Sequence, residues 1–246
     1  MKKEINFQNE KEGICDKPQI KRLFGTSSSL KGVKEKRVSI VKDNGEKVLQ
    51  IKYSKNKVGP KEGGAQWKLR FNKSYNDFSV QYKVKFNKNF EFVKGGKLPG
   101  LVGGIMPVGG EKSIGGFSAR IMWRKKGEIS QYVYYEGKNK GKRFGEDFYW
   151  KINDKSVKFQ KNKWHILKTR IKMNTPGKKD GIVQSWFDNK LVLKKKIMLR
   201  AKNSHFGIDA FNFTTFFGGN DKTWAPKKDE YVLFDNFIIS DKNSQV

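Results

Sequence analysis

The sequence has few of the residues that form metal sites and disulfides. It contains one cysteine, Cys15, and two histidines, His165 and His205. A single cysteine excludes an intramolecular disulfide, and we interpret Cys15 as structurally incidental. Neither histidine has the HxxxH or HExxH spacing of a metal site, and His165 suits a structural role at the start of a strand. We therefore expect no metal site and no cofactor, although a structural Ca²⁺ held by loop carbonyls would leave no mark in the sequence.

Long apolar runs are also missing. No stretch reaches the length of a transmembrane span, so we expect no membrane partner. The N-terminal residues MKKEINFQNEKEG begin with basic charge, but no apolar segment follows. As given, the sequence is therefore expected to carry no signal peptide.

Acidic residues are scarce relative to basic ones. The chain has 53 lysine and arginine residues against 24 acidic ones, which gives a net charge of +29 and a pI near 10.0. A field of this sign concentrates polyanions, which include nucleic acids, sulfated glycans, polyuronates and anionic membranes. The excess is mostly lysine spread along the whole chain, which also suits a merely solvated surface. Recognition of bases or phosphates depends more on arginine, so we expect no nucleic-acid partner.

Alternating polar and apolar residues predict an all-β protein. Short strand-like runs are separated by Gly, Asn, Asp and Lys, and no long stretch has a helical period. The predicted strands are 37–40, 47–53, 65–71, 77–86, 117–123, 130–136, 165–173, 181–187, 191–198 and 231–240. We predict a β-jelly roll or β-sandwich of two antiparallel sheets in a single domain over residues 1–246, with residues 1–35 partly irregular.

A hairpin between residues 117 and 135 gathers polar side chains on one face. In the first run Ser118 and Arg120 alternate with apolar residues, and in the second Tyr132 and Tyr134 share one face. A three-residue loop at 125–127 sets Arg120 opposite Tyr132 and Ser118 opposite Tyr134. Directly opposed side chains lie ~4.5–5.5 Å apart at Cβ, so these four groups are predicted to form one patch. A two-residue loop would instead turn the tyrosines to the other face.

Lys97 precedes this hairpin in the segment GGKLPG, which reads as a glycine-rich loop open to a sugar chain. The order of GGKLPG, FSARIMWR and Tyr-x-Tyr resembles the polysaccharide lyase family of the chlorella-virus and gastropod alginate lyases, and the related fungal glucuronan lyases. The segments NTPGKKDG and FNFTTFFGGNDKTWAPKKDEY are similar to later blocks of that family. The resemblance covers roughly residues 60–240.

The resemblance implies a lyase that cleaves a 1,4-linked polyuronate by β-elimination: alginate, with polymannuronate favoured, or glucuronan. It also implies secretion, an acidic polysaccharide as partner, and a cleft lined by Lys97, Ser118, Arg120, Tyr132 and Tyr134. Arginine suits the substrate carboxylate because its fork matches two oxygens. Lysine and tyrosine suit proton transfer, and we expect the neighbouring cations to lower their pKa values. Which of Lys97, Tyr132 and Tyr134 is the base remains open, and so does the oligomeric state.

Further substrate contacts are expected on either side of this patch. Gln66, Lys68 and Arg70 alternate with apolar residues and could hold additional uronate units. Asn220 and Trp224 are predicted to form part of a cleft rim. The alternative function is a catalytically silent module that binds acidic glycans, or nucleic acid, through the basic surface.

Overall fold

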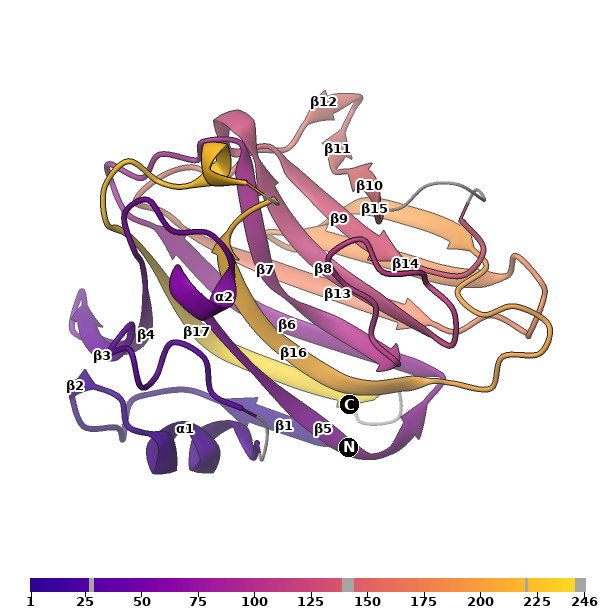
Figure 1. The fold of residues 1–246 in the computed structure, drawn as a ribbon, viewed down its shortest axis with the longest axis horizontal. Coiled ribbons are helices and arrows are strands. Elements are labelled where there is room, and N and C mark those ends of the chain that lie inside the picture. The colour runs from indigo at the N-terminus through magenta and orange to yellow at the C-terminus, as the bar shows by residue number, and fades with distance from the viewer. Residues whose placement is uncertain (27–28, 139–143, 220, 242–246) are drawn as a thin grey trace.

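The computed structural model describes residues 1–26, 29–138, 144–219 and 221–241, in which two antiparallel sheets lie face to face (Figure 1). The larger sheet has nine strands in the order β15-β14-β13-β6-β17-β4-β3-β2, with β1 beside β17. Its strands, in chain order, are β1 (Lys2–Ile5), β2 (Gly13–Ile14), β3 (Val38–Asp43), β4 (Glu46–Tyr53), β6 (Asp77–Phe86), β13 (Trp164–Lys172), β14 (Gly181–Phe187), β15 (Lys190–Ile197) and β17 (Glu230–Asp241).

The smaller sheet has six strands in the order β10-β9-β8-β7-β16-β5. These are β5 (Ala65–Tyr75), β7 (Gly95–Gly104), β8 (Gly116–Arg124), β9 (Ile129–Tyr134), β10 (Glu146–Tyr149) and β16 (Ile208–Phe217). The remaining elements are α1 (Lys17–Phe24), α2 (Gly59–Glu62), the hairpin of β11 (Lys151–Ile152) and β12 (Lys155–Ser156), and two 3₁₀ turns at Lys125–Gly127 and Lys222–Trp224. Every strand pairing among the described residues is antiparallel, which confirms the predicted all-β jelly-roll class.

Most of the strands predicted from alternation are present. β6 and β14 have the predicted bounds, and the other predicted strands begin and end within a few residues of them. The turn Asp188-Asn189 joins β14 to β15 as expected, with φ of 48° and 66°, the left-handed values that a tight hairpin turn requires. β7 and β16 were not predicted as strands. β7 is rich in glycine, and β16 is buried on both faces and therefore lacks alternation.

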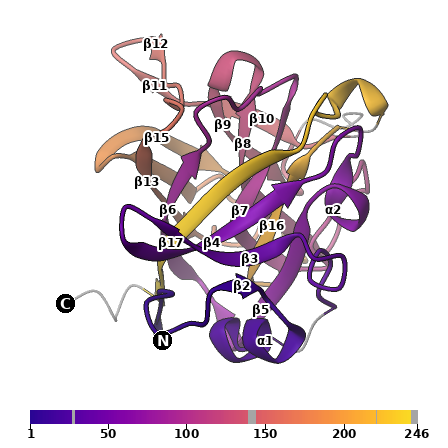
Figure 2. The same cartoon turned by 90° about the vertical axis from the view of Figure 1, so that its left-hand side faces the viewer.

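Aromatic side chains fill the space between the sheets. Phe24, the last residue of α1, closes one end of this core. Its ring centroid lies 5.1 Å from that of Trp67 on β5, 5.5 Å from that of Phe213 on β16 and 5.6 Å from that of Phe237 on β17. These distances lie in the favourable range for edge-on aromatic pairs. Figure 2 shows α1 at the end of the sandwich, below β2 and β5.

The N-terminal segment contains the helix α1 between irregular stretches. Asp16 accepts a hydrogen bond from the Gln19 amide at 2.8 Å and so caps α1, while Gly25 ends the helix with φ of 63°. Cys15 is buried beside this helix, and burial raises the pKa of its thiol to about 12, which fits an unreactive cysteine. Neither helix in the described residues is long and apolar enough to cross a membrane.

Candidate active site

The register of the β8–β9 hairpin places the predicted polar patch as expected. Ser118 pairs with Tyr134 and Arg120 pairs with Tyr132. The connection is the turn Lys125–Gly127, in which Gly127 has φ of 78°. The side chains of this face lie on the side of the six-stranded sheet that points away from the core.

Lys97 reaches the patch from a strand and not from a loop, which corrects the sequence interpretation. It lies on β7, next to β8, at a bulge between Lys97 and Gly100. The flanking glycines permit close strand packing. A Cβ at Gly96 would lie 2.1 Å from the Trp123 ring, and one at Gly100 would lie 2.0 Å from the Ala119 carbonyl oxygen. Glycine is therefore required here by the neighbouring strand β8, which is a different reason from the one inferred from the sequence.

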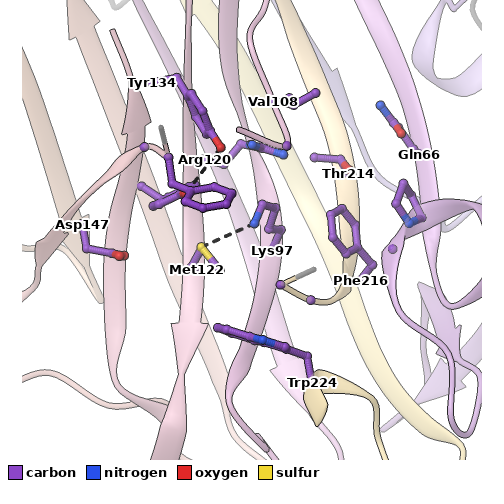
Figure 3. Close-up of a pocket in the computed structure, with 18 of the residues that line it drawn as sticks. Gln66, Lys97, Val108, Arg120, Met122, Tyr134, Asp147, Thr214, Phe216 and Trp224 are labelled. Carbon is purple, nitrogen blue, oxygen red and sulfur yellow. Dashed lines mark hydrogen bonds between the residues drawn. The ribbon is translucent and has the colours of Figure 1, made fainter. Parts of the chain in front are cut away.

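A cavity of about 650 Å³ lies over this face of the sheet (Figure 3). Of the ten side chains predicted for the site, six line it: Gln66, Lys97, Arg120, Tyr132, Tyr134 and Trp224. Ser118, Lys68 and Arg70 do not line it, although Lys68 and Arg70 lie on the outward face of β5 as predicted. Asn220 lies outside the described residues. Its neighbours Gly218 and Gly219 line the cavity beside Trp224, where the rim was expected.

Arg120 is the most unusual group in the cavity. Its side chain is 2% exposed, and its Nε and Nη2 atoms have no hydrogen-bond partner among the described residues. Burial lowers the pKa of its guanidinium to about 10. A buried cation without a partner carries a large desolvation cost, and a bound carboxylate would offset that cost with two charge-assisted hydrogen bonds.

Lys97 lies beside Arg120 in surroundings that favour its neutral form. Its Nζ is 4.9 Å from the Tyr132 ring centroid, 5.6 Å from that of Phe216, and 3.8 Å from the Met122 sulfur. Burial, and then the charges of Arg120 and Arg124, hold the pKa of Lys97 well below its usual value. A lysine in this state can accept a proton near neutral pH.

The two tyrosines lie edge to face, with ring centroids 5.5 Å apart. The Tyr132 hydroxyl donates to the Tyr134 oxygen at 3.5 Å, and the Gly110 amide donates to that same oxygen at 3.0 Å. Burial raises the pKa of Tyr132, which is opposite to the lowering expected from the nearby cations. Desolvation outweighs the attraction of Arg120, so Tyr132 keeps its proton and is a donor.

Ser118 lies behind the cavity wall and does not line the cavity. It is fully buried, and its hydroxyl donates to the Pro107 carbonyl at 2.8 Å. Pro107 lies in the loop between β7 and β8, which brings Val108 and Gly109 to the cavity wall and the Gly110 amide to Tyr134. Ser118 therefore contacts the loop that covers the site, and it is not aimed at a substrate.

Several residues of the cavity were missed in the sequence. Asp147 on β10 forms a bidentate ion pair with Arg124 and accepts from the Ser130 hydroxyl at 2.6 Å. The missed lining residues also include Lys31, Pro60, Met122, Phe144, Thr214 and Phe216. The alternation of β8 places Met122 and Arg124 on the face of Arg120, so these two could have been found. The others depend on β10, β16 and loops that no periodic pattern marks.

No cluster of three His, Cys, Asp or Glu side chains in the described part of the chain could hold a metal ion. His165 is buried in the scaffold. Its Nε2 accepts from the Gln160 amide at 3.0 Å, and its Nδ1 lies 2.8 Å from an Asp188 carboxylate oxygen. The structural role expected for this histidine agrees with these contacts.

A β-sandwich with a cationic, tyrosine-lined cavity on one sheet is the arrangement expected of a jelly-roll polysaccharide lyase. The chain belongs to the polysaccharide lyase 14 family, whose sequence model matches residues 41–237. No protein with a curated description matches the sequence significantly.

Solved structures agree with this assignment. The alginate lyase from the marine Aplysia kurodai is 26% identical, with a TM-score of 0.76 over 97% of this chain and 98% of that one. Alginate lyase Aly36B is 23% identical and has a TM-score of 0.84 over 98% and 97% of the two chains, which shows a shared fold and no more. The endo-β-1,4-glucuronan lyase of the fungus Trichoderma reesei, at 10% identity and a TM-score of 0.56 over 100% and 97%, shares the fold alone.

Proposed function

We propose that this polysaccharide lyase cleaves 1,4-linked polyuronates by β-elimination and that alginate is its substrate. The observation that carries the proposal is the buried guanidinium of Arg120, whose Nε and Nη2 atoms have no hydrogen-bond partner among the described residues, beside a lysine of lowered pKa. A uronate carboxylate is the planar anion that fits this guanidinium. Binding it there would neutralise the charge that otherwise keeps the adjacent C5 proton from leaving.

Lys97 serves as the base in this mechanism. In its neutral form it removes the C5 proton, the electron pair of that bond forms the C4–C5 double bond, and the C4–oxygen bond breaks. The departing glycosidic oxygen needs a proton, which the tyrosine pair supplies. Tyr134 donates it, and Tyr132 returns a proton to Tyr134 through their shared hydrogen bond. Solvent then takes the proton from Lys97 and restores the pair, so that protons balance.

Alginate is proposed as substrate because the Aplysia kurodai relative is an alginate lyase and its similarity extends over nearly the whole chain. We favour its mannuronate blocks, with glucuronan as the next substrate to test. On the same family resemblance that implied secretion, we propose that the enzyme acts outside the cell. We also propose that it works without a cofactor, so a chelator should leave the rate unchanged.

The test is a panel of polymannuronate, polyguluronate, glucuronan and hyaluronan, followed by the ultraviolet absorbance of the unsaturated uronate product. Wild-type protein should release this product from polymannuronate, whereas Arg120→Lys should lose most of the rate because a point charge cannot replace the two-pronged contact. Lys88→Ala, which removes an exposed lysine outside the cavity, is the matched control. Binding to these polymers without any unsaturated product would contradict the proposal and favour the glycan-binding module.

A further inference from the structure

A second, smaller depression lies on the outer face of the nine-stranded sheet. It has a volume of about 250 Å³ and is lined by Gln81, Ile166, Lys168, Trp186 and Asn189. These strand residues alternate with Leu167 and Phe187, which are buried in the core. The depression therefore faces away from the six-stranded sheet and from the active-site cavity.

The strand register aligns three of these side chains in a row across the sheet. Lys168 on β13 pairs with Gln81 on β6 on one side and with Trp186 on β14 on the other. The Lys168 ammonium lies 5.4 Å from the centre of the Trp186 ring and has no carboxylate partner among the described residues. A half-buried indole and an unpaired cation thus form one wall of the depression.

The turn that supplies Asn189 is held in place by its neighbour Asp188. The Asp188 amide donates to the Ile166 carbonyl at 2.9 Å, and the Ile166 amide donates back to the Asp188 carboxylate at 2.8 Å. The second carboxylate oxygen contacts the buried ring of His165 at 2.8 Å. The carboxylate of Asp188 is therefore engaged by Ile166 and His165, and the turn holds Asn189 in a fixed position beside the depression.

The charges around the depression favour an anion. Lys83 on β6 pairs with Ile166 at its edge and forms no ion pair within 4.0 Å in the described ranges. The carboxylate of Asp77, farther along the same two strands, is neutralised by a bidentate contact with Arg170. Asp235, opposite Lys83 on β17, is largely buried, and burial raises the pKa of its carboxyl.

We propose that this depression is a second binding site, outside the catalytic cavity, for one uronate unit of the acidic polysaccharide. The proposal rests on the proposed function for the class of polymer. The half-buried Trp186 indole suits apolar contact with a sugar ring, and Lys168 beside it suits the carboxylate of that sugar. Gln81 and Asn189 supply hydrogen-bonding groups for hydroxyls.

A site on the opposite face from the cavity contributes to capture and not to bond cleavage. A long polymer held at the back of the molecule has a raised effective concentration near the cavity, whereas a short oligosaccharide gains nothing from the second contact. The site should therefore affect KM for polymers, leaving kcat and the cleavage of short substrates unchanged.

The experiment compares wild type with Trp186→Ala and Lys168→Gln in native gels that contain polymannuronate, and in rate assays on the polymer and on a tetrasaccharide. Relative to their migration in a gel without polymer, both variants should be retarded less by the polymer than wild type, and their polymer KM should rise by about threefold or more. Their kcat/KM on the tetrasaccharide should equal that of wild type.

Lys194→Gln is the matched control, because Lys194 is an exposed cation on the adjacent strand β15 and lies outside the depression. It should behave as wild type. Equal weakening by Lys194→Gln, or unchanged migration and KM in the other two variants, would overturn the second site. If Trp186→Ala has a lowered melting temperature, the result for Lys168→Gln alone decides.

A wild-type protein that is retarded by the polymer but releases no unsaturated product would contradict the proposed function while leaving the second site standing.

Discussion

At the scale of single residues, burial determines which groups in the cavity carry protons. Lys97 and Arg120 are both cations held away from water, and burial disfavours the charged form of each; the charge of Arg120 lowers the pKa of Lys97 further. Burial also raises the pKa of Tyr132. The same desolvation therefore produces a lysine that can accept a proton and a tyrosine that keeps one.

Replacing Lys97 by methionine tests the role of this lysine. Lys97→Met should reduce kcat by about 10²–10⁴-fold, the usual contribution of a positioned base. The melting temperature at neutral pH should stay equal or rise, because the variant removes a cation whose charged form is penalised by burial. Kinetics and thermal unfolding on the same samples give both values, with Lys88→Ala as control. A variant with wild-type kcat would remove Lys97 from the mechanism.

The pH profile follows from the directions of two pKa shifts. Lys97 must be neutral to act, so kcat/KM rises with pH through its lowered pKa, below the ~10.4 of an ordinary lysine. Arg120 must be charged, so kcat/KM falls as pH passes its pKa of about 10. Initial rates across neutral and alkaline pH should give a bell-shaped dependence of kcat/KM on pH. A rising limb at or above the ordinary lysine value would show that Lys97 is not the base.

At the scale of elements, alternation predicted the β8–β9 hairpin and the pairing of Arg120 with Tyr132, because a period of two reports which face of a sheet is buried. It could not predict β7, whose glycines have no side chains to alternate, or β16, which is apolar on both faces. The placement of Lys97 on a strand was missed for this reason. Asp147 was missed because β10 is too short to have a period.

Ser118 joins β8 to the loop over the cavity, and Ser118→Ala tests that connection. The change removes the hydrogen bond to Pro107 and should loosen the loop that aims the Gly110 amide at Tyr134. We expect a lower kcat with a small fall in melting temperature, and faster hydrogen exchange at the Gly110 amide. A residue with a purely structural role would lower the melting temperature without changing exchange at that amide or the kcat of the folded enzyme.

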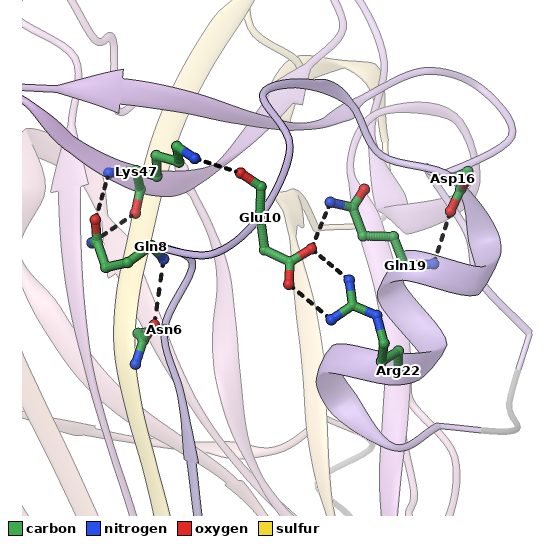
Figure 4. Close-up of polar contacts among 7 residues, drawn as sticks. All are labelled: Asn6, Gln8, Glu10, Asp16, Gln19, Arg22 and Lys47. Carbon is green, nitrogen blue, oxygen red and sulfur yellow. Dashed lines mark hydrogen bonds and ion pairs between the residues drawn. The ribbon is translucent and has the colours of Figure 1, made fainter.

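At the scale of the whole molecule, residues before the family match complete the fold (Figure 4). Glu10, buried between α1 and β4, accepts two hydrogen bonds from Arg22, at 2.9 and 2.7 Å, and one from Gln19 at 2.8 Å. Its carbonyl accepts from the Lys47 ammonium at 2.8 Å. These contacts hold the N-terminal segment and α1 against the nine-stranded sheet.

Glu10→Gln should therefore lower the free energy of unfolding by on the order of 1 kcal/mol, since Arg22 itself is exposed to solvent. Hydrogen bonds from Arg22 hold the pKa of Glu10 below its usual value. The stabilisation is complete above the unfolded pKa of ~4.3 and is lost as pH falls through the lower folded pKa. Denaturant unfolding should show a difference in free energy of unfolding between wild type and Glu10→Gln at neutral pH. This difference should narrow in acid, and kcat should be the same for both proteins. A difference in free energy of unfolding that stays constant at all pH values would show that the ion pair is not its cause.

The net charge of +29 acts on the polymer before any single site does. Its field is screened over about 8–10 Å at ordinary salt, so added salt should weaken long-range capture of a polyanion. The contact proposed between Arg120 and the substrate would be shielded from that screening, because the Arg120 side chain is buried. Rates on polymannuronate at increasing salt should therefore show a rising KM at nearly constant kcat. The same trend should persist in Lys168→Gln, because removing one cation leaves the rest of the field intact. A kcat that falls with salt while KM stays constant would mean that the surface charge acts on the chemical step and not on capture.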